Sequence, residues 1–177
     1  ELEKKYKNLK LIFHAKNLGY GRALQSGFKH ASYDLIFYTD GDGQYDVKEL
    51  PILVALMQSD VDFVNGIKHA RSDPTYRIVI GNAYSLFVRW FFWVPITDVD
   101  CDFRLMRKSV LDKIHLTSEH GAICVELVKK AQKSGARFRE VSINHYERRW
   151  GESQFFRVRT ILFSLAELVR LWFRLMF

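Results

Sequence analysis

Cysteine is scarce in this 177-residue sequence, and several kinds of segment are missing from it. Its two cysteines, Cys101 and Cys124, form neither a CxxC pair nor a Cys/His cluster. This excludes a disulfide framework and a structural zinc site, and it favours a reduced compartment with both thiols buried as small apolar residues. There is no internal repeat, low-complexity tract or linker rich in Pro, Gly or Ser, so we expect one domain with a C-terminal appendage.

Long uncharged apolar runs and a targeting segment are also lacking. No run reaches about 18 apolar residues, so no segment clearly spans a bilayer. The first ten residues, ELEKKYKNLK, hold no initiating Met, apolar signal core or small-residue cleavage site, and they are typical of the end of an amphipathic helix. Apolar material is nevertheless plentiful, because 48% of the residues are hydrophobic and 15% aromatic. That is enough for one core and argues against disorder.

Positive charge outweighs negative charge, and the formal net charge is +7. From Arg89 to the end there are 16 Lys and Arg against 10 Asp and Glu. This bias suits an anionic partner, which is a membrane surface, a phosphate group or a nucleic acid. A basic nucleic-acid-binding module is a remote alternative, but the aromatic residues lie mostly within apolar runs and no RNA- or DNA-binding motif is present. We therefore expect no nucleic acid partner.

Short apolar runs alternate with helical patterns along the chain, which indicates an α/β protein. The expected strands are 9–15, 34–40, 62–67, 101–107 and 137–147, and the expected helices are 21–31, 47–58, 77–93, 109–114 and 122–135. Gly135 is expected to cap the last of these helices. The βαβ rhythm predicts a sheet that is at least partly parallel, with ligands gathering at the carboxyl ends of its strands.

One such strand end carries the stretch YTDGDGQYDVKEL, with Asp40, Asp42 and Gln44 at alternate positions. A turn explains Gly and Asp here, whereas a divalent cation explains the converging oxygens. A calcium-binding EF-hand loop is excluded, because its sixth and twelfth positions, normally Gly and Glu, would be Tyr45 and Pro51. An Asp-x-Asp at a strand end suits a metal ion that also holds the phosphates of a substrate.

Five motifs follow one another along the chain, and their order is specific to one family: NLGYGRAL, DLIFYTDGDGQYDVKEL, DVDCDFRLMRKSVL, VEL and EVSINHYERRWGESQF. Up to about Phe156 the sequence resembles the family 2 glycosyltransferases of the GT-A fold, most of all the polyprenyl-phosphate sugar synthases of the dolichyl-phosphate mannose synthase group. The resemblance implies a Rossmann-like α/β fold with a mixed, mostly parallel sheet and flanking helices. The family's first strand-helix-strand unit, with PxYNE-like and DDGS-like segments, has no counterpart before Asn17. We therefore expect an amino-terminally truncated, partial GT-A domain over residues 1–153.

The resemblance also implies an activity. The expected enzyme transfers a sugar from a nucleotide-sugar donor to a polyprenyl or dolichyl phosphate at the cytoplasmic face of a membrane. Mg²⁺ or Mn²⁺, held by Asp40, Asp42 and Gln44, would lie against the donor diphosphate. A glycosyltransferase with a saccharide acceptor, acting in cell-envelope polysaccharide synthesis, is the alternative.

Further residues match the family's donor- and phosphate-binding positions. The implied set is Asn17, Gly19, Gly21, Asp40, Arg71, Arg104, Arg148, Arg149 and Ser153. Glycine at a helix start lets backbone amides approach an anion, although a plain strand-to-helix turn explains it as well. A guanidinium binds phosphate in a planar, bidentate way, and a solvated surface charge is the alternative for each arginine. Arg71 is the weakest match, because NGIKHAR departs from the Gly-Ser-Arg of this group.

Two acidic residues, Asp98 and Glu126, match family positions near the acceptor and are the expected catalytic residues. A sugar hydroxyl needs a general base, whereas a phosphate is already ionised and needs only positioning. Asp102 stands where the lipid-phosphate branch commonly has Gly. His145 is expected to be a structural histidine at a strand end.

The last segment, 154–177, is expected to be an amphipathic helix lying in a membrane interface. Polar residues recur every three or four positions at Arg157, Thr160, Ser164, Glu167, Arg170 and Arg174, and apolar residues fill most of the rest. A narrow cationic stripe on a broad apolar helix is typical of interfacial helices. A helix buried against the domain is the alternative.

Overall fold

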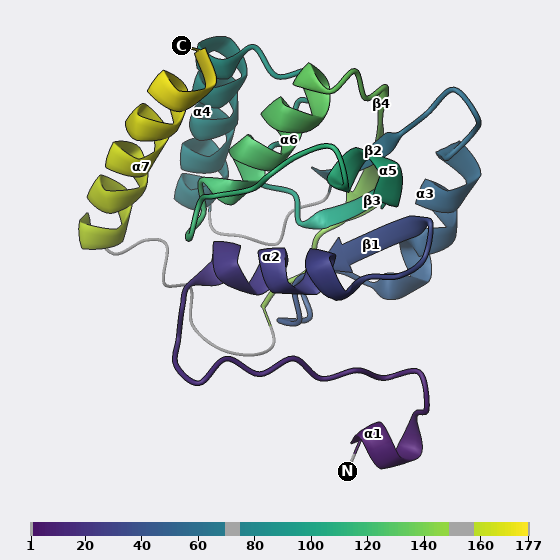
Figure 1. Ribbon diagram of the computed structural model, residues 1–177. Coiled ribbons are helices and arrows are strands. Elements are labelled where there is room, and N and C mark those ends of the chain that lie inside the picture. Colours follow the sequence, from purple (N-terminus) through teal and green to yellow (C-terminus); the bar gives the residue numbers. More distant parts are fainter. Residues whose placement is uncertain (1, 70–74, 149–157, 177) are drawn as a thin grey trace.

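The computed structural model describes residues 2–69, 75–148 and 158–176 (Figure 1). The α-helices are α1 (Leu2–Lys5), α2 (Tyr20–His30), α3 (Leu50–Leu56), α4 (Thr75–Phe92), α5 (Lys108–Leu111), α6 (Ile123–Lys133) and α7 (Val158–Met176), and a 3₁₀ turn, η1, covers Val47–Glu49. The strands are β1 (Leu35–Thr39), β2 (Phe63–His69), β3 (Phe103–Arg107) and β4 (Phe138–Asn144). Every helix expected from the sequence is present, and Gly135 follows α6 with a φ of 87°, the left-handed conformation that ends a helix.

The sheet is mixed, with the strand order β1-β3-β2-β4. Strand β3 is antiparallel to both of its neighbours, and β2 is parallel to β4. Three strands, β1, β2 and β4, therefore run in one direction. Their carboxyl ends meet at one edge of the sheet, where the segments after β1 and β4 begin.

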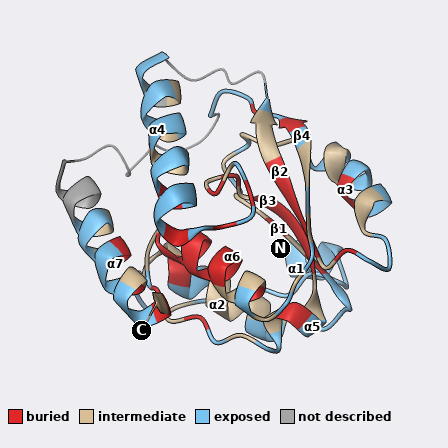
Figure 2. Cartoon of the chain, turned by 90° about the horizontal axis from the view of Figure 1, so that it is seen from above, coloured by how far each residue is buried: buried red, intermediate tan, exposed pale blue. Residues whose placement is uncertain are grey.

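Helices cover both faces of the sheet, and the alternation of side chains along each strand supplies both cores. Met106 belongs to the larger core, under α4, α6 and α7, while the adjacent Leu105 belongs to the smaller core against α3. In Figures 1 and 2, α4, α6 and α7 lie together on one side and α3 lies alone on the other.

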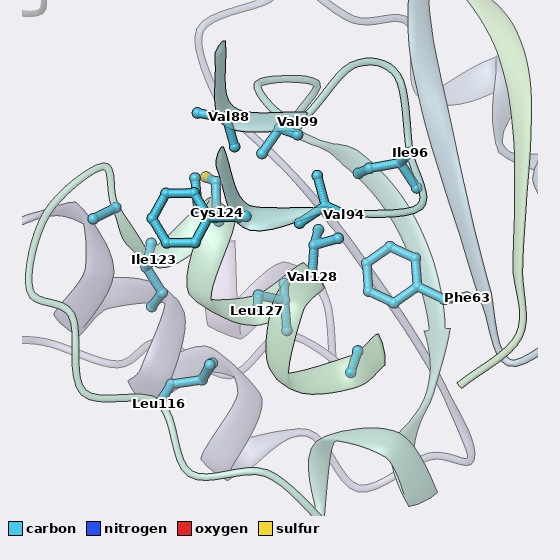
Figure 3. Close-up of a cluster of buried hydrophobic side chains, with 14 of the residues drawn as sticks. Phe63, Val88, Val94, Ile96, Val99, Leu116, Ile123, Cys124, Leu127 and Val128 are labelled. Atoms are coloured by element: carbon cyan, nitrogen blue, oxygen red, sulfur yellow. The ribbon is translucent and has the colours of Figure 1, made fainter. Parts of the chain in front are cut away.

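Helix α6 forms the centre of the larger core, because eight of its eleven residues are buried. Figure 3 shows Ile123, Leu127 and Val128 of α6 packed among Phe63 and the apolar residues before β3. Each such side chain stabilises the fold by roughly 1.5–3 kcal/mol through burial. Both cysteines are buried and free, as the sequence predicts. The apolar residues between α4 and β3, which include Val94 and Ile96, thus anchor that connection to the core.

The strand expected at 9–15 was wrong. This segment has no regular structure, lies along the outside of the molecule away from the sheet in Figure 1, and leaves Phe13 82% exposed. The apolar pattern of a strand is not sufficient, because a strand needs a neighbouring strand to pair its backbone groups. None of the described strands lies beside it.

Helix α7 packs on the domain along one face. Leu168, Leu171 and Leu175 are buried in the larger core, and Trp172 Nε1 donates a hydrogen bond of 3.2 Å to the carbonyl oxygen of Phe91 on α4. The opposite face remains exposed. The alternative, a helix packed against the domain, therefore holds for one face, and the membrane-interface interpretation stays a prediction. None of the described helices is long and apolar enough to cross a membrane.

Candidate functional site

The acidic segment after β1 forms a series of tight turns at the carboxyl end of the strand. Asp42 Oδ1 accepts a hydrogen bond of 3.0 Å from the N–H of Gln44, and Asp46 Oδ1 accepts one of 3.0 Å from the N–H of Lys48. Gly43 has a φ of 79°, which glycine adopts without strain. The segment therefore forms the turns that its Gly and Asp residues predict. These turns bring the carboxylates of a short segment near one another.

Asp40 is the most perturbed carboxyl group of this segment. Burial, followed by the charges of Asp102 and Asp42, raises its pKa from 3.8 to about 7. A raised pKa of this kind marks a place where carboxylates converge in a poorly solvated site. Asp102 thus joins Asp40 and Asp42 as the third acidic residue of this cluster. The sequence indicated it only as a departure from the family pattern.

The segment after β4 reaches the same site. Arg148 Nη2 lies 2.8 Å from Asp42 Oδ2. Gln44 and Tyr146 join the two segments, because the N–H of Tyr146 donates to the carbonyl oxygen of Gln44 at 2.9 Å and Gln44 Nε2 donates to the carbonyl oxygen of Tyr146 at 3.3 Å. The side-chain amide of Gln44 is thereby oriented with Nε2 toward Tyr146, which leaves Oε1 as its acceptor.

Asp40, Asp42 and Gln44 offer two carboxylates and an amide oxygen to a cation. Among the described residues, no group of three or more His, Cys, Asp and Glu side chains is placed to hold a metal ion. Two carboxylates suit an ion such as Mg²⁺, which takes one or two protein carboxylates and completes its coordination with water and substrate phosphates. The donor set fits a cation that shares its coordination with a diphosphate rather than one enclosed by protein.

The connection between α4 and β3 brings Asp98 close to the carboxyl end of β2. Asp98 Oδ1 lies 3.1 Å from Lys68 Nζ, and Asp98 Oδ2 accepts a hydrogen bond of 3.0 Å from the N–H of Lys68. Burial alone would lower the pKa of Lys68, but the charges of Asp98 and Asp100 raise it. Burial raises the pKa of Asp100 to about 6. No motif in the sequence indicated Lys68, because its role depends on a residue 30 positions away.

Glu126 lies away from the strand-end cluster, fully buried on α6. Its carboxylate accepts hydrogen bonds from the N–H of Thr117 at 3.0 Å and the N–H of Ser118 at 2.7 Å, and Lys130 Nζ lies 2.6 Å from it. Burial would raise its pKa, but these partners lower it. In this arrangement Glu126 fixes the loop before α6.

The start of α2 is packed tightly against the loop before α6. A Cβ atom on Gly19 would lie 2.5 Å from the carbonyl oxygen of Glu119, and one on Gly21 would lie 2.3 Å from the carbonyl oxygen of Ser118. Asn17 Oδ1 accepts a hydrogen bond of 2.9 Å from the N–H of Gly19. Close backbone packing is thus sufficient to explain both glycines. A cavity of about 570 Å³ opens beside them, lined by Asn17, Leu18, Gly19, Tyr20, Glu119 and His120.

The remaining expected site residues differ in how far the structure describes them. Arg104 is 0% exposed in the centre of the sheet and faces no solvent. His145 is buried directly after β4, and its ring lies edge-to-face with that of Tyr45 at a centroid distance of 5.2 Å, as expected of a structural histidine. The expected residues Arg71, Arg149 and Ser153 lie outside the described ranges.

Comparison with curated proteins identifies relatives over most of the chain. The undecaprenyl-phosphate 4-deoxy-4-formamido-L-arabinose transferases of Salmonella paratyphi B and Salmonella newport are each 28% identical over 153 residues. These matches cover 85% of this chain and 46% of each relative. The chain therefore spans about half the length of the curated relatives it matches.

Comparison with solved structures agrees. Glucosyl-3-phosphoglycerate synthase from Mycobacterium tuberculosis, in complex with UDP, superimposes with a TM-score of 0.63 at 13% identity, over 95% of this chain and 58% of that one. The same enzyme with Mn²⁺, UDP and glucosyl-3-phosphoglycerate gives a TM-score of 0.59 at 15% identity, over 95% and 55% of the two chains. At these identities the likeness shows the fold, which is the GT-A fold expected from the sequence.

The family model described as Glycosyl transferase family 2 matches residues 1–115, well over half of the chain. The chain belongs to glycosyl transferase family 2.

Proposed function

We propose that this protein transfers a sugar from a nucleotide-sugar donor to a polyprenyl phosphate at the cytoplasmic surface of a membrane. The observation that carries the proposal is the meeting of two segments at the carboxyl edge of the sheet. The acidic segment after β1 holds Asp40 and Asp42, and the basic segment after β4 brings Arg148 to within 2.8 Å of Asp42. A site of this kind accommodates a cation and an anionic phosphate side by side.

The chemistry needs few groups from the protein. An oxygen of the acceptor phosphate attacks the anomeric carbon of the sugar, the bond from that carbon to the donor diphosphate breaks, and a nucleoside diphosphate leaves. A divalent cation, Mg²⁺ or Mn²⁺, bound at Asp40, Asp42 and Gln44 would stabilise the charge on the leaving diphosphate. Because a phosphate acceptor is already ionised near neutral pH, no general base is required and the acceptor needs only to be held in line.

The chain's own residues are proposed to do that positioning. Arg148 would turn from Asp42 to a phosphate oxygen, and we retain Arg71, Arg149 and Ser153 as proposed further contacts. Asp98, held by Lys68, is proposed to border the acceptor. Glu126 is proposed to act indirectly, through the loop that packs on Gly19 and Gly21. We retain both glycines and Asn17 as proposed residues of the donor side.

An exposed apolar surface supports a membrane-bound acceptor. Trp90 on α4 is 72% exposed and Phe173 on α7 is 57% exposed. The two helices are in contact through Phe91 and Trp172, whose ring centroids lie 5.1 Å apart. Arg170 is exposed on the same helix as Phe173, which suits an anionic lipid surface. The names of the Salmonella relatives, which specify undecaprenyl phosphate, support the same acceptor class.

The site assignment is tested by Asp42→Ala in the complete protein. Loss of a cation ligand should lower metal-dependent release of nucleoside diphosphate by roughly 100-fold or more, as loss of other electrostatic stabilisers does. Asp46→Ala is the matched control, because Asp46 only caps the 3₁₀ turn after the same segment. Wild-type turnover by Asp42→Ala at limiting Mg²⁺ would remove Asp42 from the site.

A further inference from the structure

Four residues in register cross the whole width of the sheet. Tyr38 on β1 pairs with Arg104 on β3, Arg104 pairs with Asn65 on β2, and Asn65 pairs with Glu140 on β4. Residues in register on neighbouring strands share a face. Asn65 lies two positions after Phe63, so these residues, here called the cross-sheet row, face the larger core.

The loop of residues 97–102, which enters β3, runs over this row. At its start, the carboxylate of Glu140 accepts hydrogen bonds from the N–H of Thr97 at 2.9 Å and from its hydroxyl at 3.0 Å. One residue further on, Asn65 Nδ2 donates a hydrogen bond of 2.9 Å to the carbonyl oxygen of Asp98. The first two residues of the loop are thus held by β4 and β2.

The middle of the loop is held by Arg104. Its Nε donates to the carbonyl oxygen of Cys101 and to Asn65 Oδ1, both at 2.9 Å, and its Nη2 donates to the carbonyl oxygen of Val99. A buried guanidinium is costly unless such acceptors surround it. Lysine, with one nitrogen at the tip, cannot reproduce this fork.

The end of the loop is held from β1 and from the acidic segment. The hydroxyl of Tyr38 donates a hydrogen bond of 3.2 Å to Asp102 Oδ1. The N–H of Asp102 donates one of 3.3 Å to the hydroxyl of Tyr45, which belongs to the segment after β1. Asp102 is therefore tied directly to the part of the chain that holds Asp40.

We propose that the cross-sheet row is a set of positioning residues, which fix the loop 97–102 and thereby hold Asp102 against the acidic segment and Asp98 beside Lys68. Along the loop, the contacts come first from β4, then from β2, β3 and β1. This is also the order of the strands across the sheet. This assigns Arg104 to the loop rather than to a phosphate, in keeping with its complete burial. The effect on catalysis rests on the proposed function, whereas the effect on the loop does not.

Glu140→Ala is the variant that tests the loop, because Glu140 is only partly buried and its loss should leave the fold intact. Amide hydrogen exchange of Thr97 should become roughly tenfold faster or more, since a hydrogen bond to a charged group is worth at least that factor. Glu140→Gln, which keeps one acceptor oxygen, should restore most of the protection. Asp62→Asn is the matched control, because Asp62 holds Arg137 at the other end of the β2–β4 pair and should leave Thr97 unchanged.

Steady-state kinetics of the complete protein test the consequence for catalysis. Glu140→Ala should lower kcat by roughly tenfold while KM for the nucleotide sugar changes less than about threefold, because misplaced groups slow the step rather than weaken donor binding. Unchanged exchange at Thr97 would overturn the proposal, and so would faster exchange with unchanged kcat, which would reduce the row to a structural role. An inactive wild type would contradict the proposed function instead, and the exchange result would then decide by itself whether the row fixes the loop.

Discussion

Ionisation of Asp40 lowers the stability of the folded protein. Its surroundings, which include Asp42 and Asp102, favour the protonated form. A carboxyl group whose folded-state pKa is raised binds a proton more tightly in the folded protein than in the unfolded chain. Stability is then greatest below the unfolded pKa and falls as pH rises toward the folded pKa. A bound cation would reverse this cost, which is the arrangement expected of a metal ligand.

Asp40→Asn should therefore flatten the pH dependence of stability in metal-free buffer. Between about pH 4 and pH 7 the wild type loses stability, because Asp40 is ionised in the unfolded chain but still protonated in the folded protein. The variant has no group at this position that ionises. At pH 8 the variant should be more stable than the wild type by on the order of 4 kcal/mol, since the pKa of Asp40 is raised from 3.8 to about 7. Urea unfolding at pH 4.5 and at pH 8 measures the difference. Parallel pH profiles for the two proteins would show that Asp40 is not perturbed by its neighbours.

Individual residues also mark where sequence reasoning reached its limit. Asp40, Asp42 and Gln44 are identifiable because they are close in sequence and follow a strand. Arg104 also stands in a family motif, but its burial depends on three carbonyl and amide acceptors that only the folded sheet brings together. Lys68 carries no local signal for the same reason.

At the scale of elements, α7 presents two different faces. Leu171 is buried in the larger core, and Phe173, two residues later, is exposed. The periodicity of the sequence predicts an amphipathic helix, but it does not show whether protein or lipid covers the apolar side. Tertiary contacts decide this, and they divide the apolar residues between the core and the surface.

Leu171→Ala and Phe173→Ala should separate these two faces. Leu171→Ala should lower the free energy of unfolding by roughly 2–4 kcal/mol, because it leaves a cavity in the core. Phe173→Ala should change it by less than about 0.5 kcal/mol, as exposed substitutions usually do. Chemical denaturation measures both. Equal losses in the two variants would mean that α7 packs differently from the arrangement described.

Liposome flotation should give the opposite ranking. Exposed aromatic residues insert at a bilayer surface, so the Trp90→Ser/Phe173→Ser double variant should float poorly with anionic liposomes, and Leu171→Ala should float like the wild type. High salt should weaken binding, because Arg170 acts through charge. Flotation of the double variant as strong as that of the wild type would exclude this face as the membrane contact.

The elements as a whole follow from the sequence with one exception. Period-2 and period-3.6 patterns predicted every described strand and helix of the α/β core, since each buries a face of its own. The segment 9–15 carries a strand pattern but no partner strand, and pairing cannot be derived from a local pattern. The same applies to the cross-sheet row, whose four residues are far apart in sequence and meet only through strand register.

The whole molecule combines a strand-end acidic cluster, a basic segment beside it and exposed apolar residues on α4 and α7. Each feature suits one part of the proposed reaction. The acidic cluster suits a metal-bound donor, the basic segment suits the phosphate of the acceptor, and the apolar residues suit its lipid tail. A saccharide acceptor would use the first feature but would leave the third without a role.

The most direct test is an assay of the complete protein with nucleotide sugars, Mg²⁺ or Mn²⁺, and either a polyprenyl phosphate or a free saccharide as acceptor. The expected result is release of nucleoside diphosphate together with a lipid-linked sugar phosphate, dependent on the metal and on the polyprenyl phosphate. Transfer to the saccharide alone, or lipid-linked product formed equally well in the presence of a chelator, would contradict the proposed function.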